Sequence, residues 1–137
     1  MALRAVIQEG QMSQFHNLSD IANALNALSE KGSKSINRHF LTQTDKMTAQ
    51  VVQFSETKNS LHVQNNHDEL LVIISGEIDF KVGGEIRKTR ANDTIFVPAG
   101  IMHGPVLKKG ETFTALSIFA PRFEFNNKNI QWERDKG

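Results

Sequence analysis

The sequence predicts a single all-β domain, a barrel or jelly roll, preceded by one amphipathic helix. Three observations predict this fold. About eight short strand-like segments follow one another from residue 35 onward, with turn residues between them. No linker rich in Gly, Pro or Ser divides these segments, and no internal repeat is visible. The length of 137 residues fits one domain with its own hydrophobic core.

The predicted helix occupies about residues 18–31, within an N-terminal extension formed by residues 1–34. Asn17 or Ser19 can cap its start. Apolar residues recur at helical spacing and form one stripe: Ile21, Leu25 and Leu28. We therefore expect this helix to pack against another part of the molecule and to carry no chemistry.

The expected barrel occupies residues 35–120, and two patterns identify its strands. Apolar residues from Ile78 to Val82 alternate with charged ones, as in a strand with one buried face, and Gly83-Gly84 then predicts a tight hairpin turn. The run from Leu70 to Ile74 is apolar throughout, as in a strand covered on both faces. The candidate strands are Ile36–Thr42, Met47–Phe54, Leu61–Gln64, Glu69–Ser75, Ile78–Val82, Ile86–Thr89, Thr94–Val97 and Thr112–Phe119.

Composition and charge exclude several classes of function. The net charge is +1, and Lys and Arg are spread along the chain, so we expect no binding to nucleic acid or to a membrane surface. The absence of cysteine excludes disulfides, thiolate metal ligands and cysteine nucleophiles. The N-terminus lacks the apolar stretch of a signal peptide, and no apolar run approaches the ~18 residues of a membrane span. We therefore expect a cytoplasmic protein.

The residues suited to chemistry gather in two segments. His62, His67 and Glu69 belong to one strand–turn–strand segment, and His103 follows a Pro-x-Gly turn about forty residues later. An antiparallel barrel can bring these segments together. Imidazole and carboxylate are suitable ligands for Fe, Mn, Ni, Co or Zn. Gln64 lies two residues after His62, so both side chains project to the same face of a strand.

These two segments resemble the two sequence motifs of the cupin superfamily. The first family motif has His-x-His before a Glu and a later Gly, and the core of the second is Pro-x-Gly-x-x-His. The matching positions are His62, Glu69 and Gly76 in the first segment, and Pro98, Gly100 and His103 in the second. The order of the motifs and the hairpin between them also match. The resemblance covers residues 35–120 and implies a small single-domain cupin barrel.

The resemblance implies one divalent transition metal bound by His62, Glu69 and His103, with Glu69 also the candidate catalytic base. Gln64 departs from the motif, because it stands where the family has a second histidine, and an amide is the weaker ligand. Two histidines and one carboxylate remain, as in facial-triad iron sites, with Gln64 as a possible fourth ligand. The departure is equally compatible with a weakened site, or with one that binds an organic ligand without metal. Asn92 replaces a motif glycine and tolerates the left-handed conformation.

Each candidate residue can also be explained without a catalytic or ligand-binding role. His62 and His103 can be ordinary strand histidines, and Glu69 can be a surface residue at a strand edge. Gln64 is either a metal ligand or an amide that contacts substrate. His67 is expected to be a solvated turn histidine, with a role as ligand, substrate contact or proton shuttle as the alternative.

Two functions follow from these readings. The first is a metal-dependent small-molecule enzyme with oxygenase-like (dioxygenase), lyase or isomerase chemistry on a small oxygenated organic substrate. The alternative is a non-catalytic ligand-binding or sensory barrel with a degenerate metal site. Residues 121–137 form a tail with large apolar residues that packs on the barrel or on a partner. This tail and the exposed barrel edges predict a homodimer.

Overall fold

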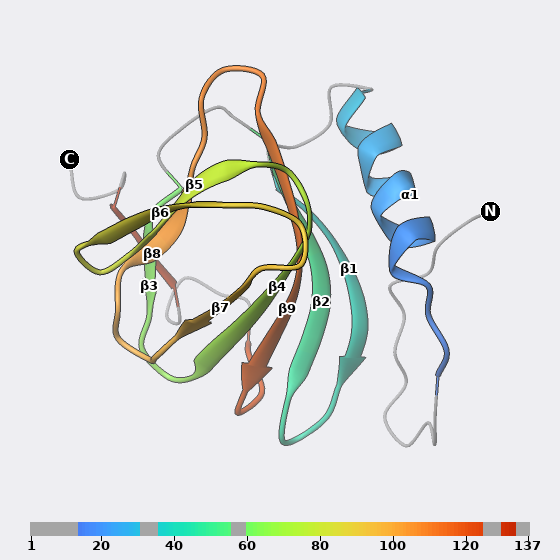
Figure 1. The fold of residues 1–137 in the computed structure, drawn as a ribbon. Helices are drawn as coiled ribbons and strands as arrows, with labels where there is room; N and C mark the ends of the chain where they lie inside the picture. Colours follow the sequence, from blue (N-terminus) through green and yellow to red (C-terminus); the bar gives the residue numbers. More distant parts are fainter. Residues whose placement is uncertain (1–13, 31–35, 56–59, 125–129, 134–137) are drawn as a thin grey trace.

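The computed structural model describes residues 14–30, 36–55, 60–124 and 130–133, which form one helix and ten strands (Figure 1). The other residues, including half of the predicted N-terminal extension and much of the tail, lie outside the described residues. The elements are α1 (Leu18–Glu30), β1 (Ile36–Gln43), β2 (Thr48–Ser55), β3 (His62–Gln64), β4 (Asp68–Ser75), β5 (Ile78–Val82), β6 (Glu85–Thr89), β7 (Thr94–Val97), β8 (His103–Val106), β9 (Thr112–Ala120) and β10 (Ile130–Trp132).

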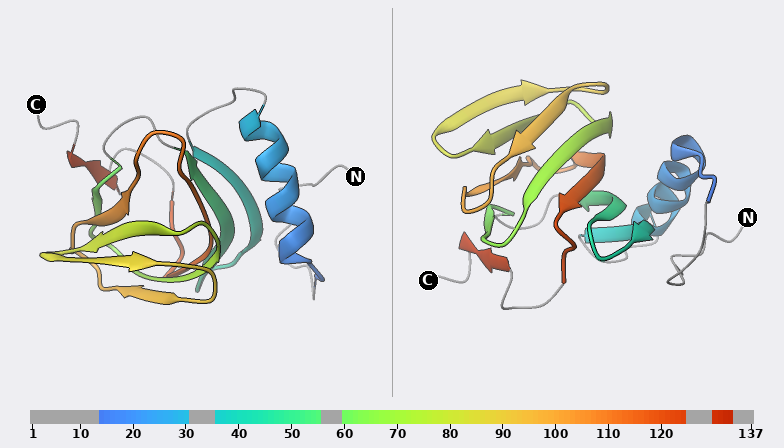
Figure 2. Two further views of the ribbon diagram at one scale, coloured as in Figure 1. Left: turned by 45° about the horizontal axis from the view of Figure 1, so that its top comes forward. Right: turned by 90° about the horizontal axis from the view of Figure 1, so that it is seen from below.

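The strands form two five-stranded sheets, and the pairings are antiparallel. One sheet has the order β1-β2-β9-β4-β7, and the other has the order β10-β3-β8-β5-β6. Figure 2 shows the two sheets curving around a common interior, with α1 outside them. The prediction of an all-β barrel or jelly roll with one N-terminal helix is therefore confirmed.

The main core fills the space between the two sheets. Strand alternation directs Ile78 and Phe80 inward from β5, where they are 1% and 4% exposed, against Phe113 and Ala115 from β9. The hairpin predicted at Gly83-Gly84 joins β5 to β6. The apolar run in β4 is not covered on both faces throughout, because Leu70 is 40% exposed on the outer face. That part of the prediction is wrong.

Helix α1 packs on the outer face of the first sheet, beside β1 and β2 (Figure 1). Ile21 and Leu25 are buried there against Val51. The helix begins as predicted, because the Asp20 N–H donates a hydrogen bond of 3.0 Å to the Asn17 side-chain oxygen. Leu28, however, is 47% exposed, so the buried stripe ends one turn earlier than predicted. Within the described ranges, no helix is long and apolar enough to cross a membrane.

Two strands were not predicted, and both lie beside the candidate site. β8 begins at His103 and continues through Gly104 and Pro105, residue types that are depleted in strands. β10 lies in the predicted tail and pairs with β3, which places Trp132 opposite His62. These two strands flank β3 in the second sheet.

A candidate metal and ligand site inside the barrel

The pairing of β3 with β8 places two histidines side by side. His62 lies opposite His103 in register, and their ring centroids are 4.4 Å apart. Both side chains are buried, at 5% and 2% exposed. Gly104 permits this close approach, because a Cβ atom there would lie 2.6 Å from the backbone oxygen of Ser60. Its φ of 154° is also one that side-chain-bearing residues rarely adopt.

The Pro98–Gly100 turn is fastened to the first motif segment by two hydrogen bonds. The Gly100 N–H donates to the Gln64 carbonyl at 2.9 Å, and the Ala99 N–H donates to the Asp68 carboxylate at 2.9 Å. Gly100 adopts a φ of 85°, which explains the glycine at this motif position. The turn therefore holds the start of β8 against β3.

Both imidazole rings are oriented by their own backbone. Nδ1 of His62 lies 2.8 Å from the Ser60 carbonyl oxygen, and Nδ1 of His103 lies 2.9 Å from the Ile101 carbonyl oxygen. A carbonyl oxygen can only accept a hydrogen bond, so each Nδ1 carries a proton and donates it. Burial, with a further contribution from His103, lowers the pKa of His62 to about 4. His62 is therefore neutral at pH 7, with its lone pair on Nε2.

Glu69 reaches the same place from β4 and is held from two sides. Its Oε1 lies 3.0 Å from Nε2 of His103, and the Ser117 hydroxyl donates to Oε2. Because Nδ1 of His103 already donates to a carbonyl, Nε2 is the ring nitrogen that remains for the contact with Glu69.

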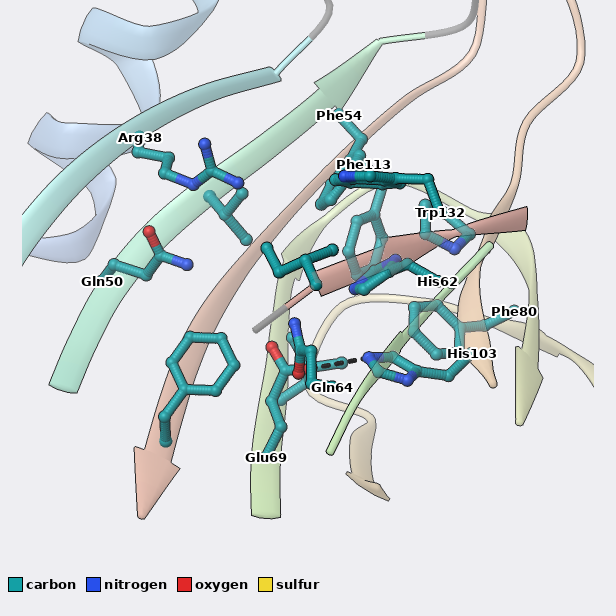
Figure 3. A pocket seen from close by; sticks show the side chains of 16 residues that line it. Arg38, Gln50, Phe54, His62, Gln64, Glu69, Phe80, His103, Phe113 and Trp132 are labelled. Carbon is teal, nitrogen blue, oxygen red and sulfur yellow. Dashed lines mark hydrogen bonds and ion pairs between the residues drawn. The ribbon is translucent and has the colours of Figure 1, made fainter. Parts of the chain in front are cut away.

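These side chains line a small cavity of about 30 Å³ between the sheets (Figure 3). The polar part of the wall consists of Arg38, Gln50, His62, Gln64, Glu69 and His103. Gln64 and His62 share the inner face of β3, as their spacing predicted. Trp132 adds an aromatic wall, with its ring centroid 4.6 Å from that of His62. The cavity has room for about two water molecules, so a larger ligand extends beyond it.

Sequence reasoning missed Arg38, Gln50 and Ser117. Each lies on a strand in which polar and apolar residues alternate or mix, and alternation alone does not say which face is inside. Ser117 had one available signal, because it interrupts the apolar part of β9. Trp132 was placed in the C-terminal tail, and its position at the cavity was not predicted.

His67 lies in the bend between β3 and β4, but it is only 3% exposed. The expectation of a solvated turn histidine is therefore wrong. The ring packs edge-on against Phe119 and Phe123, with centroid distances of 5.2 and 4.3 Å. Burial lowers its pKa, so the ring is neutral at pH 7. The residues that line the cavity do not include His67.

The imidazole nitrogens and the carboxylate are suitable ligands for a metal ion, although they are not arranged around one common point. Each Nδ1 donates to a carbonyl, the arrangement that leaves Nε2 of a metal-binding histidine free to coordinate. Within the described residues, however, no group of three His, Asp or Glu side chains is placed to hold a metal ion. Glu69 is hydrogen-bonded to the very nitrogen that His103 would offer to a metal.

Comparison with known proteins agrees with this architecture. The family model described as "Cupin domain" matches residues 50–119. None of the curated proteins is significantly similar to the chain.

Solved structures with the same fold come from several bacteria. KdgF from Halomonas sp. is 24% identical, with a TM-score of 0.58, over 66% of this chain and 82% of that one. A conserved protein with a double-stranded β-helix domain from Klebsiella pneumoniae is 22% identical, with a TM-score of 0.59, over 73% and 85%. An RmlC-like cupin from Shewanella frigidimarina is 23% identical, with a TM-score of 0.56, over 67% and 81%. At these identities the likeness establishes the fold alone.

Proposed function

The chain belongs to the cupin family, and on that premise we propose that it is a metal-dependent enzyme acting on a small oxygenated organic molecule. The observation that carries the proposal is the orientation of the two buried imidazoles. His62 and His103 each donate Nδ1–H to a carbonyl two residues earlier, which directs both Nε2 atoms away from the backbone. Both side chains line one cavity together with a carboxylate and an amide.

The proposed cofactor is one divalent transition metal, among Fe, Mn, Ni, Co and Zn. Nε2 of His62 and His103 would hold it, with Glu69 and Gln64 as oxygen donors. When bound, such a metal polarises a substrate oxygen or supports chemistry with O₂. This is the basis for proposing oxygenase-like, lyase or isomerase chemistry.

The protein side chains would contribute proton transfer and a dry environment. Glu69 is hydrogen-bonded to His103 and lines the cavity, so its carboxylate is the candidate base that exchanges a proton with a bound substrate. Ser117 fixes the other carboxylate oxygen and thereby the direction of Oε1. Phe80, Phe113 and Trp132 line the same cavity and limit the access of water.

A second candidate function, a non-catalytic ligand-binding barrel, is favoured by one observation. Glu69 and His103 already satisfy each other, and Gln64 replaces the histidine of the family motif. In that case the polar cavity would bind an organic molecule directly, without metal.

Metal uptake distinguishes the two functions. Untagged protein is treated with EDTA, dialysed and titrated calorimetrically with Mn²⁺, Co²⁺, Ni²⁺ and Zn²⁺, and freshly purified protein is analysed for its elements. We expect about one equivalent of transition metal per chain, and His103→Ala should weaken binding about 100-fold or more. Gln64→His should tighten binding, because imidazole is the stronger ligand.

His16→Ala is the matched control, because it removes an exposed histidine outside the cavity. It should leave the titration unchanged. Wild-type protein that takes up none of these metals, or a His103→Ala variant that binds them as tightly as the wild type, would contradict the metal-dependent enzyme.

A further inference from the structure

Two polar side chains of the cavity have no part in the proposed metal site. Arg38 enters from β1 and Gln50 from β2, on the inner face of the first sheet. Figure 3 shows both directed into the cavity from one side, while His62 and His103 lie across from them. An amide on the inner face of a barrel is costly to bury unless its polar atoms are hydrogen-bonded.

Gln50 has a buried hydrogen-bond acceptor that a ligand could satisfy. The residue is 3% exposed, and its Oε1 accepts no hydrogen bond from the part of the chain that the structure describes. A buried carbonyl-type oxygen of this kind is suited to a donor group on a ligand. An O–H or N–H group of a bound molecule would satisfy it.

Arg38 offers a second group that could bind the ligand, beside the Gln50 oxygen. Its burial lowers the pKa of the guanidinium, against the attraction of Glu69, yet an arginine remains charged under all ordinary conditions. A planar guanidinium in a partly dehydrated wall is well suited to bind a carboxylate through paired hydrogen bonds.

Arg38 gives the cavity wall one permanent positive charge, which can attract an anionic group of a ligand. The ionisable residues among its lining are Arg38, His62, Glu69 and His103. A divalent metal would add further positive charge.

We propose that Arg38 and Gln50 select a short hydroxycarboxylic acid, with Arg38 binding the carboxylate and Gln50 Oε1 accepting a hydrogen bond from the hydroxyl. This inference rests on the proposed function in one respect, since it names the substrate class for the same cavity. The cavity of about 30 Å³ limits the part that enters to a few atoms, which favours a short monoanion over a larger phosphorylated molecule.

The test compares three small probes by chemical-shift titration of EDTA-treated, metal-free protein. Glycolate carries both groups, acetate lacks the hydroxyl and glycolamide lacks the charge. We expect glycolate to bind about threefold to tenfold more tightly than acetate, the effect of one hydrogen bond, and glycolamide to bind most weakly. Gln50→Leu should make glycolate and acetate bind equally.

Arg38→Gln should weaken glycolate binding at least about tenfold and leave glycolamide unchanged. Arg38→Lys keeps the charge but loses the planar guanidinium, so it should bind glycolate with an intermediate affinity. This more conservative variant keeps the test valid if Arg38→Gln fails to fold. Arg87→Gln is the matched control, because it removes an arginine whose side chain is 78% exposed, on β6.

Equal binding of the three probes by the wild type, or unaltered glycolate binding by both Arg38 variants, would overturn the inference. Because the titration uses metal-free protein, its outcome is separate from that of the metal titration. Protein that binds glycolate through Arg38 but takes up no metal would refute the metal-dependent enzyme and leave this inference standing.

Discussion

Replacing Gly104 with alanine should destabilise the protein by about 4 kcal/mol, because the close contact between β3 and β8 leaves no room for a side chain. The added Cβ would lie 2.6 Å from the Ser60 oxygen and 3.2 Å from the Leu61 Cα, both backbone atoms that cannot rotate away. Forcing alanine to a φ near 154° costs about 1–3 kcal/mol. Relieving the overlap by shifting the strands costs about 1–3 kcal/mol more. The sum is a large part of a typical stability of about 5–15 kcal/mol.

Urea unfolding followed by the fluorescence of Trp132, the single tryptophan, measures this loss. Gly84→Ala is the control, because a Cβ there meets no atom within 4 Å and the residue lacks a positive φ. It should change stability by less than about 0.5 kcal/mol. A Gly104→Ala protein whose free energy of unfolding lies within about 1 kcal/mol of the wild type would refute the argument that only glycine permits the close approach of β8 to β3.

Two further predictions concern pH and assembly. The pKa of His62 is about 4 in the folded protein and about 6.5 when unfolded, so the unfolded chain binds the extra proton between these values. The free energy of unfolding should therefore fall by up to about 3 kcal/mol as the pH drops from 6.5 to 4. Urea unfolding at several pH values should show a smaller pH dependence for His62→Gln than for the wild type. The same pH dependence in both proteins would contradict the lowered pKa of His62. Leu70 and Phe96 are paired across β4 and the edge strand β7 and are 40% and 58% exposed, so we expect the predicted homodimer to bury this pair. Sedimentation should show a dimer that Phe96→Glu dissociates, and a monomeric wild type at high concentration would exclude it.

The sequence predicted eight of the strands because their apolar residues recur with the period of a strand. Ile78–Val82 and Thr94–Val97 were predicted to the residue. The same rule failed for His103–Val106, since a Gly-Pro pair has no strand pattern and its place in the sheet depends on contacts with β3 and β5. Strand β8 was thus invisible to periodicity, and the motif spacing identified only its first residue, the candidate metal ligand His103.

The candidate site was predictable only in part, because motif spacing identifies some of its residues and strand periodicity does not identify the others. Motif spacing identified His62, Glu69 and His103, which the fold brings to one cavity. It did not identify Arg38 or Gln50, because polar residues on an inner face have the same spacing as polar residues on an outer face. Only the pairing of β1 with β2 and the closure of the barrel decide that these two side chains point inward.

The replacement of a motif histidine by Gln64 has a limited structural consequence, because the two remaining imidazoles do not depend on that position. His62 is oriented by the carbonyl of Ser60 and His103 by the carbonyl of Ile101, each within its own segment. Gln64 instead takes part through its backbone carbonyl, which accepts the hydrogen bond from Gly100, and any side chain at this position can preserve that bond. In the proposed metal site, the exchange of imidazole for amide would therefore change the strength of one donor and leave the ring orientations and the turn intact. This is why Gln64→His is expected to strengthen metal binding without rebuilding the site.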